Sequence, residues 1–330
     1  MSLTLAPEPQ SAGMARVDRG VRFLHGPIGP LLVLAMLAAA AAALPYIVGP
    51  YYQEVGYRAA QLGTLATAWN LMAGYTGLIS LGSAAFVGLG IYAATEAANE
   101  FGFALLPSLC LGAAVAGVFA VLVSPAMFRL RGLYFTIGTL ALAEALRIYM
   151  VNSSTFGGAT GIVLHGSGLA AYQLYWWALA VAVVATAVIL VVLASPASLS
   201  LRAVRDDEDV AKQMGVTTFR IKLWAFVLAA AVMGAVGGLQ AVKLGAVEPY
   251  SSFGLTWSID VVAVTIIGGQ GTRCGPWLGA LFYVVLGEAL RDYPEVHTAI
   301  TGAVLILVIR FAPAGIWGTA VHRWRKRRHA

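Results

Sequence analysis

A glycine-rich stretch, IIGGQGTRCG (Ile266 to Gly275), has residue types that could cradle a nucleotide. Its GGQG is similar to a signature loop of certain ATPases, and Gly269, Gly271 and Gly275 approach the spacing of a dinucleotide loop. A phosphate-binding loop, however, needs GxxxxGK[ST] between a strand and a helix, where backbone N–H groups and the lysine hold the phosphates. That string does not occur in this chain, and apolar runs flank the glycines on both sides. We therefore predict that the loop binds no nucleotide.

Two acid–base pairs lie inside otherwise apolar segments. Glu144 and Arg147 occur in TLALAEALRIYM, and Glu288 and Arg291 occur in VVLGEALRDY, at the same spacing of three residues. Residues three apart share one face of a helix, so each pair can neutralise itself. Charges inside a membrane are also candidates for functional sites, because a lone charge at the bilayer centre costs several kcal/mol. Both interpretations stay open from the sequence. Asp260, in WSIDVVAV, has no evident local partner.

The histidines and cysteines are too scattered to form a catalytic or metal site. The five histidines show no HExxH or other metal-ligand spacing, and no serine–histidine–aspartate arrangement can be argued. Cys110 and Cys274 make neither a CxxC motif nor a disulfide framework. We expect this chain to have no enzymatic activity and to bind no metal or cofactor.

The composition indicates that these residues lie on membrane helices. Of 330 residues, 59% are hydrophobic and 11% are charged, whereas soluble domains are about 25% charged. Apolar runs close to the ~20 residues that cross a bilayer recur along the chain. This predicts an all-α polytopic membrane protein with eight to ten transmembrane helices. We place the apolar segments at 28–48, 57–74, 77–95, 105–124, 134–151, 174–194, 224–244, 255–268, 276–291 and 297–312.

The charges outside these segments predict an orientation. A transmembrane domain (28–318) is preceded by an N-terminal segment (1–27) and followed by a basic tail (319–330). Both end segments carry several arginines, and we expect both in the cytoplasm, with the first apolar run kept as a helix rather than cleaved as a signal peptide. The tail is expected to touch membrane lipid and not nucleic acid. The loops expected in the cytoplasm contain Arg129, Arg131, Arg202, Arg205, Lys212, Arg220 and Lys222; the opposite loops contain Glu54, Glu96, Glu100 and Glu248.

Glycine clusters interrupt the apolar pattern at two places, Ala73–Gly90 and Ile266–Gly275. Interrupted spans in corresponding halves of a transporter point to a transport site. Glycine also supplies the positive φ of tight turns, so the sequence leaves a pathway and a plain turn equally open. Small residues four apart, as in Gly234/Gly238 and Gly275/Gly279, are typical of closely packed membrane helices. The candidates for the translocation path or gate are Gly74, Tyr75, Gly77, Ser80, Gly82, Gly268, Gly269 and Gly271.

The longest cytoplasmic loop, at about 195–223, contains the most informative polar stretch. The pattern predicts a short helix from Arg202 to Met214, ended by Gly215 as a C-cap. A short helix between two spans is suited to dock into a groove of a partner. The alternative is an amphipathic linker on the membrane surface. The four acids Asp206–Asp209 disfavour adhesion to anionic lipid, so we favour docking.

At this point the chain resembles the LivM-type permease subunits of branched-chain amino acid ABC importers. The resemblance runs from about residue 57 to 318 and depends on the order and spacing of its motifs. The matching strings are NLMAGYTGLISLGSAAFVGLGIYAA (Asn70 to Ala94), RLRGLYFTIGTLALAEALRI (Arg129 to Ile148), TFGGATGI (Thr155 to Ile162), RAVRDDEDVAKQMGVTTFRIKLWAF (Arg202 to Phe226), IIGGQGTRCGPWLGA (Ile266 to Ala280) and RFAPAGIWG (Arg310 to Gly318).

This resemblance implies a multi-pass permease in the bacterial cytoplasmic (inner) membrane, similar to the vitamin-B12-importer class of ABC membrane domains. It implies four kinds of partner or cofactor: a homologous LivH-like permease subunit, two ABC ATPase subunits, ATP and Mg on those ATPases, and a periplasmic or extracellular solute-binding protein. The stretch Glu208–Gly215 resembles the coupling loop that presses on the ATPase. Gln270 and Arg273-Cys274 depart from the family pattern. The residues assigned to ATPase coupling are Arg205, Asp206, Asp207, Glu208, Asp209, Ala211, Met214 and Gly215.

The leading hypothesis is therefore the translocating subunit of an ATP-driven importer of branched-chain or related amino acids. Close relatives carry urea, short amides or aromatic acids, so these substrates stay open. An ion-coupled secondary transporter is a further alternative, but it would not need the cytoplasmic helix and should show unpaired membrane acids. A membrane-embedded enzyme would need facing catalytic side chains, and none stands out.

Overall fold

The protein is a bundle of long helices, seen here in a computed structural model that describes residues 28–47, 49–165, 169–291, 300, 302–303, 306–307, 310 and 315–319. The chain runs through α2 (Ile28–Ile47), α3 (Pro50–Thr76), α4 (Ser83–Phe101), α5 (Leu105–Met127), α6 (Leu133–Asn152), the 3-10 helices η1 (Ser154–Phe156) and η2 (Gly158–Thr160), β1 (Ile162–Val163), α7 (Ala171–Ala194), α8 (Ala197–Asp206), α9 (Glu208–Gln213), α10 (Thr218–Leu244), β2 (Ala246–Val247), α11 (Pro249–Ser252), α12 (Leu255–Gly268) and α13 (Gly275–Ala289). The predicted all-α fold is confirmed. Segments 1–27 and 320–330, with most of the predicted span at 297–312, lie outside the described residues.

Five helical segments of the described chain are long and apolar enough to cross a membrane: Leu105–Met127, Leu133–Asn152, Ala171–Ala194, Thr218–Leu244 and Pro249–Gly268. The long helices α3 and α4 are not among them. Most residues of both are buried by other helices, so their surfaces contain small and polar residues that pack against protein rather than against acyl chains.

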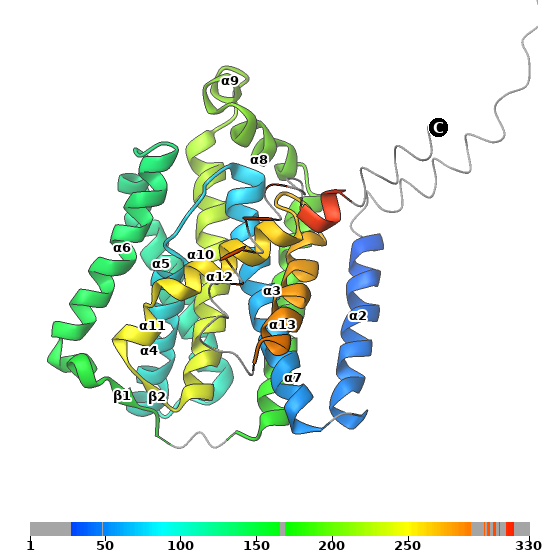
Figure 1. The fold of residues 1–330 in the computed structure, drawn as a ribbon. Coiled ribbons are helices and arrows are strands. Elements are labelled where there is room, and N and C mark those ends of the chain that lie inside the picture. Colours follow the sequence, from blue (N-terminus) through cyan, green and yellow to red (C-terminus); the bar gives the residue numbers. More distant parts are fainter. Residues whose placement is uncertain are drawn as a thin grey trace, which may run out of the picture.

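The core lies where α10 crosses α4 and α5, with α3 beside them (Figure 1). Glycines make this crossing possible. A Cβ built on Gly90 would lie 2.1 Å from the carbonyl oxygen of Gly234, and one built on Gly237 would lie 2.2 Å from that of Val87. Helix packing is therefore the role of the small residues on α10, as the spacing Gly234/Gly238 indicates. The aromatic ring of Phe226 fills the space next to them, in edge-to-face contact with Phe86.

Polar side chains inside the bundle have hydrogen-bond partners of two kinds. Threonine hydroxyls donate to the carbonyl four residues earlier in their own helix, as in Thr64 to Ala60 and Thr95 to Ile91. Between helices, the Gln61 amide donates to Gln240 Oε1 at 2.8 Å. Such pairing is favoured at membrane depth, where no water replaces a missing partner. Among the described residues, six buried polar side chains have an atom without a hydrogen-bond partner: Tyr75, Ser83, Tyr92, Thr186, Ser252 and Trp277.

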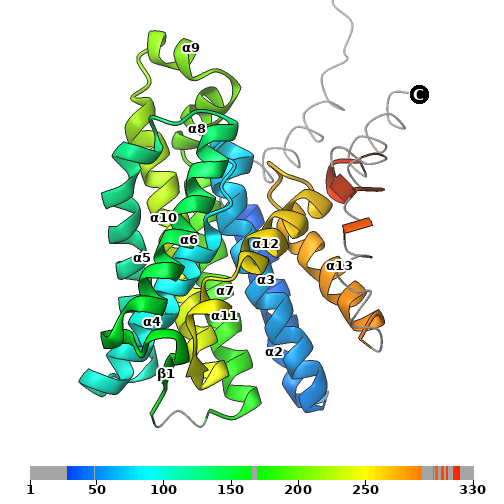
Figure 2. The same cartoon turned by 60° about the vertical axis from the view of Figure 1, so that its left-hand side comes forward.

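The two ends of the bundle differ in structure. α8 and α9 project from one end, and the short antiparallel pairing of β1 with β2 closes the other (Figure 1). The two-residue strands were not predicted, because a single bridge leaves no alternating pattern in the sequence. α12 and α13 form a hairpin on the side of α3 away from α5 (Figure 2), whereas α6 stands at the edge of the bundle with few neighbours (Figure 1).

Most predicted segments agree with helices to within a few residues, but several predictions were wrong. α3 begins at Pro50, before the predicted segment 57–74, and α4 ends at Phe101, after the predicted segment 77–95. Residues 77–82 are not helical, because Gly77, at φ +75°, ends α3 and α4 begins only at Ser83. The loop predicted at 195–223 ends at Thr217, since α10 begins at Thr218. The single helix predicted from Arg202 to Met214 is two helices, α8 and α9, that meet at Asp207.

Candidate coupling loop and glycine-loop cluster

The helix break at Asp207 gives the loop between α7 and α10 its shape. Asp207 has extended backbone (φ −159°, ψ 113°), and its carboxylate accepts hydrogen bonds from the N–H groups of Asp209 and Val210 at 2.9 and 3.0 Å. It is thus the N-cap of α9. Gly215, at φ +85°, ends the same helix, with Val216 N–H bonded to the carbonyl of Ala211. The C-cap predicted at Gly215 is therefore one residue late, because the C-cap is Met214 and Gly215 is the left-handed residue that follows it.

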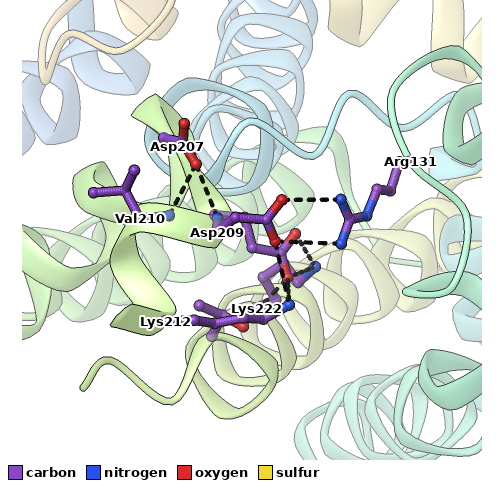
Figure 3. A network of polar contacts seen from close by, with 8 residues as sticks. Arg131, Asp207, Asp209, Val210, Lys212 and Lys222 are labelled. Atoms are coloured by element: carbon purple, nitrogen blue, oxygen red, sulfur yellow. Dashed lines mark hydrogen bonds and ion pairs between the residues drawn. The ribbon is translucent and has the colours of Figure 1, made fainter. Parts of the chain in front are cut away.

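Each of the four acids in this loop has a partner within the chain, and Figure 3 shows the partners of Asp207 and Asp209. Asp206 pairs with Arg205, and Asp207 caps α9. Asp209 accepts hydrogen bonds from Nη1 and Nη2 of Arg131, at 3.3 and 3.4 Å. Glu208 accepts two hydrogen bonds of 2.9 Å from the ammonium of Lys222. The acidic run therefore organises the loop and joins it to α10 and to the segment before α6.

The Glu208–Lys222 pair is the most enclosed of these contacts. Only 7% of the Lys222 side chain is exposed, and 24% of the Glu208 side chain. Partial burial raises the pKa of the Glu208 carboxyl, but the hydrogen bonds and charges of Lys222 and Lys212 outweigh it, and the pKa lies below its ordinary value of 4.5. A carboxyl whose pKa is lowered in the folded protein stabilises the fold at pH values above its ordinary pKa. This contribution is lost as the pH falls through the lowered pKa. The pair is therefore fully formed at neutral pH.

Apolar side chains face outward on the same loop. Ala211 is buried on the inner face of α9, while Met214 is 81% exposed and Val210 51% exposed. Leu199, on α8, is 73% exposed. Several exposed apolar side chains on a projecting hairpin are typical of a surface that docks into a groove of a partner.

The first glycine loop, residues 77–82, is fixed by side chains of neighbouring helices. Trp69 Nε1 donates to the carbonyl of Ser80 at 2.7 Å, and Thr136 donates to that of Ile79 at 2.7 Å. Thr139 accepts the N–H of Leu81 at 3.1 Å. Of the predicted gate residues here, Ser80 is fully buried. Tyr75, just before the loop, is also buried, and the guanidinium of Arg202 lies 5.7 Å from its ring centre.

The second glycine loop begins at Gly268, the last residue of α12, and ends before α13. Gly269 (φ +122°) and Gly271 (φ +75°) take backbone conformations that other residues rarely adopt. Asn70 holds the loop from α3: its Oδ1 accepts the N–H of Gly271 at 2.7 Å and its Nδ2 donates to the carbonyl of Thr272 at 2.9 Å. Both loops are therefore turns with well-satisfied backbone groups.

Arg205 connects the projecting hairpin to both glycine loops. Its Nη1 donates to the carbonyl of Gly74 at 2.9 Å, and the same nitrogen would lie 3.2 Å from a Cβ built on Gly271. A Cβ on Gly77 would lie 3.3 Å from Arg205 Cγ. The predicted coupling and gate residues, far apart in the sequence, thus meet at one end of the bundle around one guanidinium.

Sequence reasoning missed the two side chains that fix these loops, Trp69 and Asn70. They are consecutive on α3, and each binds a different glycine loop. A signal was available, because a buried asparagine in a membrane helix needs polar partners. Neither partner could be found from sequence spacing, since Asn70 is 201 residues from Gly271.

The two predicted acid–base pairs are formed within the chain. Arg147 Nε donates to Glu144 at 2.9 Å, and its guanidinium lies 4.9 Å from the ring centre of Tyr250. Arg291 lies 3.5 Å from Glu288, which also accepts a hydrogen bond from Tyr51. Self-neutralisation at this spacing is confirmed for both pairs. Asp260, which showed no local partner, accepts a hydrogen bond of 2.6 Å from Tyr283 on α13.

The family model described as "Branched-chain amino acid transport system / permease component" matches residues 51–309. This chain belongs to that family. The permease is 28% identical to the LivM proteins of Salmonella typhimurium and Escherichia coli, named as permeases of a high-affinity branched-chain amino acid transport system, over 86% of this chain and 74% of each relative. It is also 29% identical to LivH of Salmonella typhimurium over 36% of this chain and 38% of that relative.

The permease is accordingly a multi-pass membrane protein and a transport subunit. No solved structure matches it, so the similarity to the vitamin-B12-importer class stays a prediction. In chemical terms, the cluster contains no group placed to make or break a bond. What it contains is a helical hairpin, α8–α9, whose Arg205 hydrogen-bonds to α3 beside two tight turns.

We expect Asn70→Ala to loosen the second glycine loop of the permease. The substitution removes both hydrogen bonds to Gly271 and Thr272 and should lower the free energy of unfolding by about 1 to 3 kcal/mol, because Asn70 is buried and the two backbone groups lose their partner. Unfolding in detergent measures the effect. Thr64→Val is the control, since its hydroxyl bonds only a carbonyl of its own helix, and it should cost less than about 0.5 kcal/mol. Equal losses in both variants would contradict the role of Asn70.

Proposed function

We propose that this permease is the translocating subunit of an ATP-driven importer of branched-chain amino acids. The observation that carries the proposal is the family match over residues 51–309, which includes the loop with α8 and α9 and both glycine loops. The LivM relatives are named for branched-chain amino acid transport, and they are similar over 86% of this chain. The alternatives from the sequence, urea, short amides and aromatic acids, are separated from it by the transport assay below.

The charge distribution supports an orientation with α8 and α9 in the cytoplasm. The end of the bundle that carries this hairpin has Arg129, Arg131, Arg202, Arg205, Lys212, Arg220, Lys222 and Arg273. The opposite end, closed by β1 and β2, is rich in glutamate. Positive residues concentrate on the cytoplasmic side of membrane proteins. In this orientation both chain termini lie in the cytoplasm and the opposite end faces the periplasm or the cell exterior.

The mechanism proposed for coupling follows from the contacts of Arg205. ATPase closure would displace α8 and α9 through the exposed side chains of Leu199, Val210 and Met214. Arg205 would transmit this displacement to the carbonyl of Gly74 and to the loop at Gly271. A ligand or partner shifts such an equilibrium only by binding the two states differently. The glycine loops then act as the gate that responds to the hairpin.

The partners in this proposal are a LivH-like second permease, two ATPase subunits with ATP and Mg, and a solute-binding protein that delivers the amino acid. Similarity to both LivM and LivH supports a pair of related permeases. The energy of transport is placed on the ATPases, because the described part of this chain offers a docking hairpin and a helical bundle but no phosphate-binding loop.

The test is uptake by the reconstituted importer. Proteoliposomes that contain the permease and its proposed partners should accumulate radiolabelled leucine when ATP is enclosed on the ATPase side, and urea, short amides and aromatic acids should not compete with it. An ATPase inhibitor should stop the uptake, whereas a proton or sodium ionophore should leave it unchanged. Uptake that needs an ion gradient and no ATP would overturn the proposal, and uptake of urea in place of leucine would overturn its substrate.

A further inference from the structure

The Glu144–Arg147 pair lies at the middle of α6 and faces outward. At a rise of ~1.5 Å per residue, Glu144 is ~17 Å from the start of the helix at Leu133 and ~12 Å from its end at Asn152. The side chain of Glu144 is 51% exposed, and that of Arg147 is 24% exposed. The exposed stripe that contains Glu144 is otherwise apolar, with Ile137 and Ile148 about half exposed on either side. A charged pair thus interrupts an apolar surface at mid-membrane depth.

The second pair provides a comparison with the same residue types, the same spacing and a tyrosine neighbour. Glu288 is the next-to-last residue of α13, and its partner Tyr51 is at the start of α3, at the end of the bundle opposite α8 and α9. Charged side chains at that depth reach the membrane–water interface at little cost. Glu144 has no such route, because it is more than two helical turns from either end of α6. The environment of Glu144 must therefore be polar, although it is not the membrane–water interface.

Three environments are open to the exposed middle of α6: acyl chains, another subunit or an aqueous path. Acyl chains are excluded by the charges, which are costly to keep in hydrocarbon. A contact with a second subunit would have to satisfy the remaining hydrogen-bond donors and acceptors of the pair, and the thiol labelling below distinguishes that arrangement from an aqueous path. An aqueous path accommodates a neutral, hydrated pair without a further partner. Intramembrane ionisable residues of transporters face such paths.

We infer that Glu144 and Arg147 form a binding site for the zwitterionic head of an α-amino acid on the translocation path. This inference rests on the proposed function. The α-carboxylate would bind the guanidinium of Arg147, and the α-ammonium would bind the carboxylate of Glu144, which extends the pair into a ring of alternating charges. A neutral solute such as urea needs neither charge, and an aromatic acid without an amino group would meet Glu144 as a repulsive neighbour.

The surroundings of the pair fit an amino acid with an aliphatic side chain. Ala141 and Ala145, one turn before and one residue after Glu144, are exposed and small, so they leave room beside the carboxylate. Ile137 and Ile148 extend apolar surface along the helix in both directions. Tyr250, on α11, holds Arg147 through its ring at 4.9 Å and fixes the side of the site next to α12.

The first test is leucine uptake by the complete importer in proteoliposomes. Glu144→Gln with Arg147→Gln should reduce the uptake rate about tenfold or more, because charge-assisted hydrogen bonds to both ends of the zwitterion are lost. ATP hydrolysis stimulated by the loaded binding protein should persist. The matched control, Glu288→Gln with Arg291→Gln, should change uptake by less than about twofold. Equal effects of the two double variants would overturn the inference.

A charge exchange separates a binding role from a structural one. Glu144→Arg with Arg147→Glu keeps an ion pair at the same spacing, so a pair that only stabilises α6 should regain normal uptake. If the site receives the zwitterion in one orientation, the exchanged variant should not regain normal uptake. The thermal stability of its importer should nevertheless match that of the wild type. Full recovery of uptake would overturn the inference.

Thiol labelling tests the aqueous path independently of transport. In a background with Cys110→Ser and Cys274→Ser, Ala141→Cys should react with a membrane-impermeant thiol reagent, and leucine with its binding protein should slow the reaction. Leu122→Cys, on the exposed face of α5, is the lipid-facing control and should not react. No labelling of Ala141→Cys would place this face against lipid or a subunit and overturn the inference.

If the wild-type importer carries urea but not leucine, the zwitterion site fails while ATP-driven import stands. Labelling protected by leucine in an importer that needs no ATP would support the site and reject the coupling.

Discussion

Glu208→Ala is expected to uncouple ATP hydrolysis from transport and to destabilise the permease by about 2 to 4 kcal/mol. Removing one member of a buried ion pair costs about 3 to 5 kcal/mol, because the remaining charge is left without a partner. The value here should be somewhat lower, since 24% of the Glu208 side chain is exposed. The charge left behind is Lys222, which is 7% exposed and lies 5.3 Å from the ring centre of Phe128. Without Glu208, α9 loses its link to α10.

Uncoupling follows because α9 carries the exposed docking side chains while Glu208 fixes the helix to the bundle. We expect ATPase activity in the reconstituted importer to continue and leucine uptake to fall about tenfold, with membrane insertion unchanged. Uptake per ATP hydrolysed is the measurement that separates this from simple misfolding. Replacing all four acids, Asp206–Asp209, by Ala should uncouple the importer at least as strongly, and normal transport in that variant would refute the assignment of the loop.

Two variants control for the ion pair. Asp206→Ala removes an exposed acid whose partner, Arg205, keeps its hydrogen bond to Gly74, so stability should change by less than about 0.5 kcal/mol. Glu208→Leu with Lys222→Met removes both charges and should recover most of the stability lost in Glu208→Ala. If the double variant is as unstable as Glu208→Ala, the unpaired lysine is not the cause of the loss.

Much of the fold was predictable, because hydrophobic length is the strongest signal in a membrane protein. The segments 255–268 and 105–124 predicted α12 and most of α5, and the all-α class follows from the bilayer's demand for internal backbone pairing. The errors occur where charged residues lie inside a helix, so that the change from apolar to polar sequence does not mark the helix boundary. Lys222 and Arg220 indicated a loop, yet they lie in α10, because Glu208 neutralises Lys222 at the start of that helix.

The candidate site was predictable in its parts but not in its assembly. The acid run, the glycine clusters and the two acid–base pairs were all evident from residue types and spacing. The approach of the acid run and of both glycine clusters to Arg205 was not, because Gly74 is 131 residues from Arg205 in the sequence. The run of acids argued against adhesion to anionic lipid, but it did not reveal that three of the four form ion pairs and that the fourth caps α9. Such pairing depends on tertiary contacts that no local pattern encodes.

Gly279→Ala is expected to separate α12 from α13 and to lower stability by about 3 kcal/mol. A Cβ at this position would lie 1.9 Å from the carbonyl oxygen of Val264 and 2.9 Å from the backbone nitrogen of Gly268. Overpacking typically costs 1 to 3 kcal/mol, and the upper end applies because the obstacle is backbone, which cannot rotate away as a side chain does. The helices must move apart, and the loop between them moves with them.

That movement should also impair transport, because the α12–α13 hairpin carries the glycine loop that Asn70 and Arg205 contact. Displacing α13 draws Gly271 away from Asn70 Oδ1, now at 2.7 Å, and from the guanidinium that joins the loop to α8. We expect leucine uptake to fall at least about tenfold. Gly117→Ala in α5 is the matched control, because its Cβ would meet only side chains and a carbonyl at 3.7 Å or more, and Ala is the better helix former by up to ~1 kcal/mol. The control should therefore keep its stability and its uptake. A Gly279→Ala permease with both at wild-type levels would show that the close contact of α12 with α13 is not required, and the two glycine loops would then have to be coupled by another route.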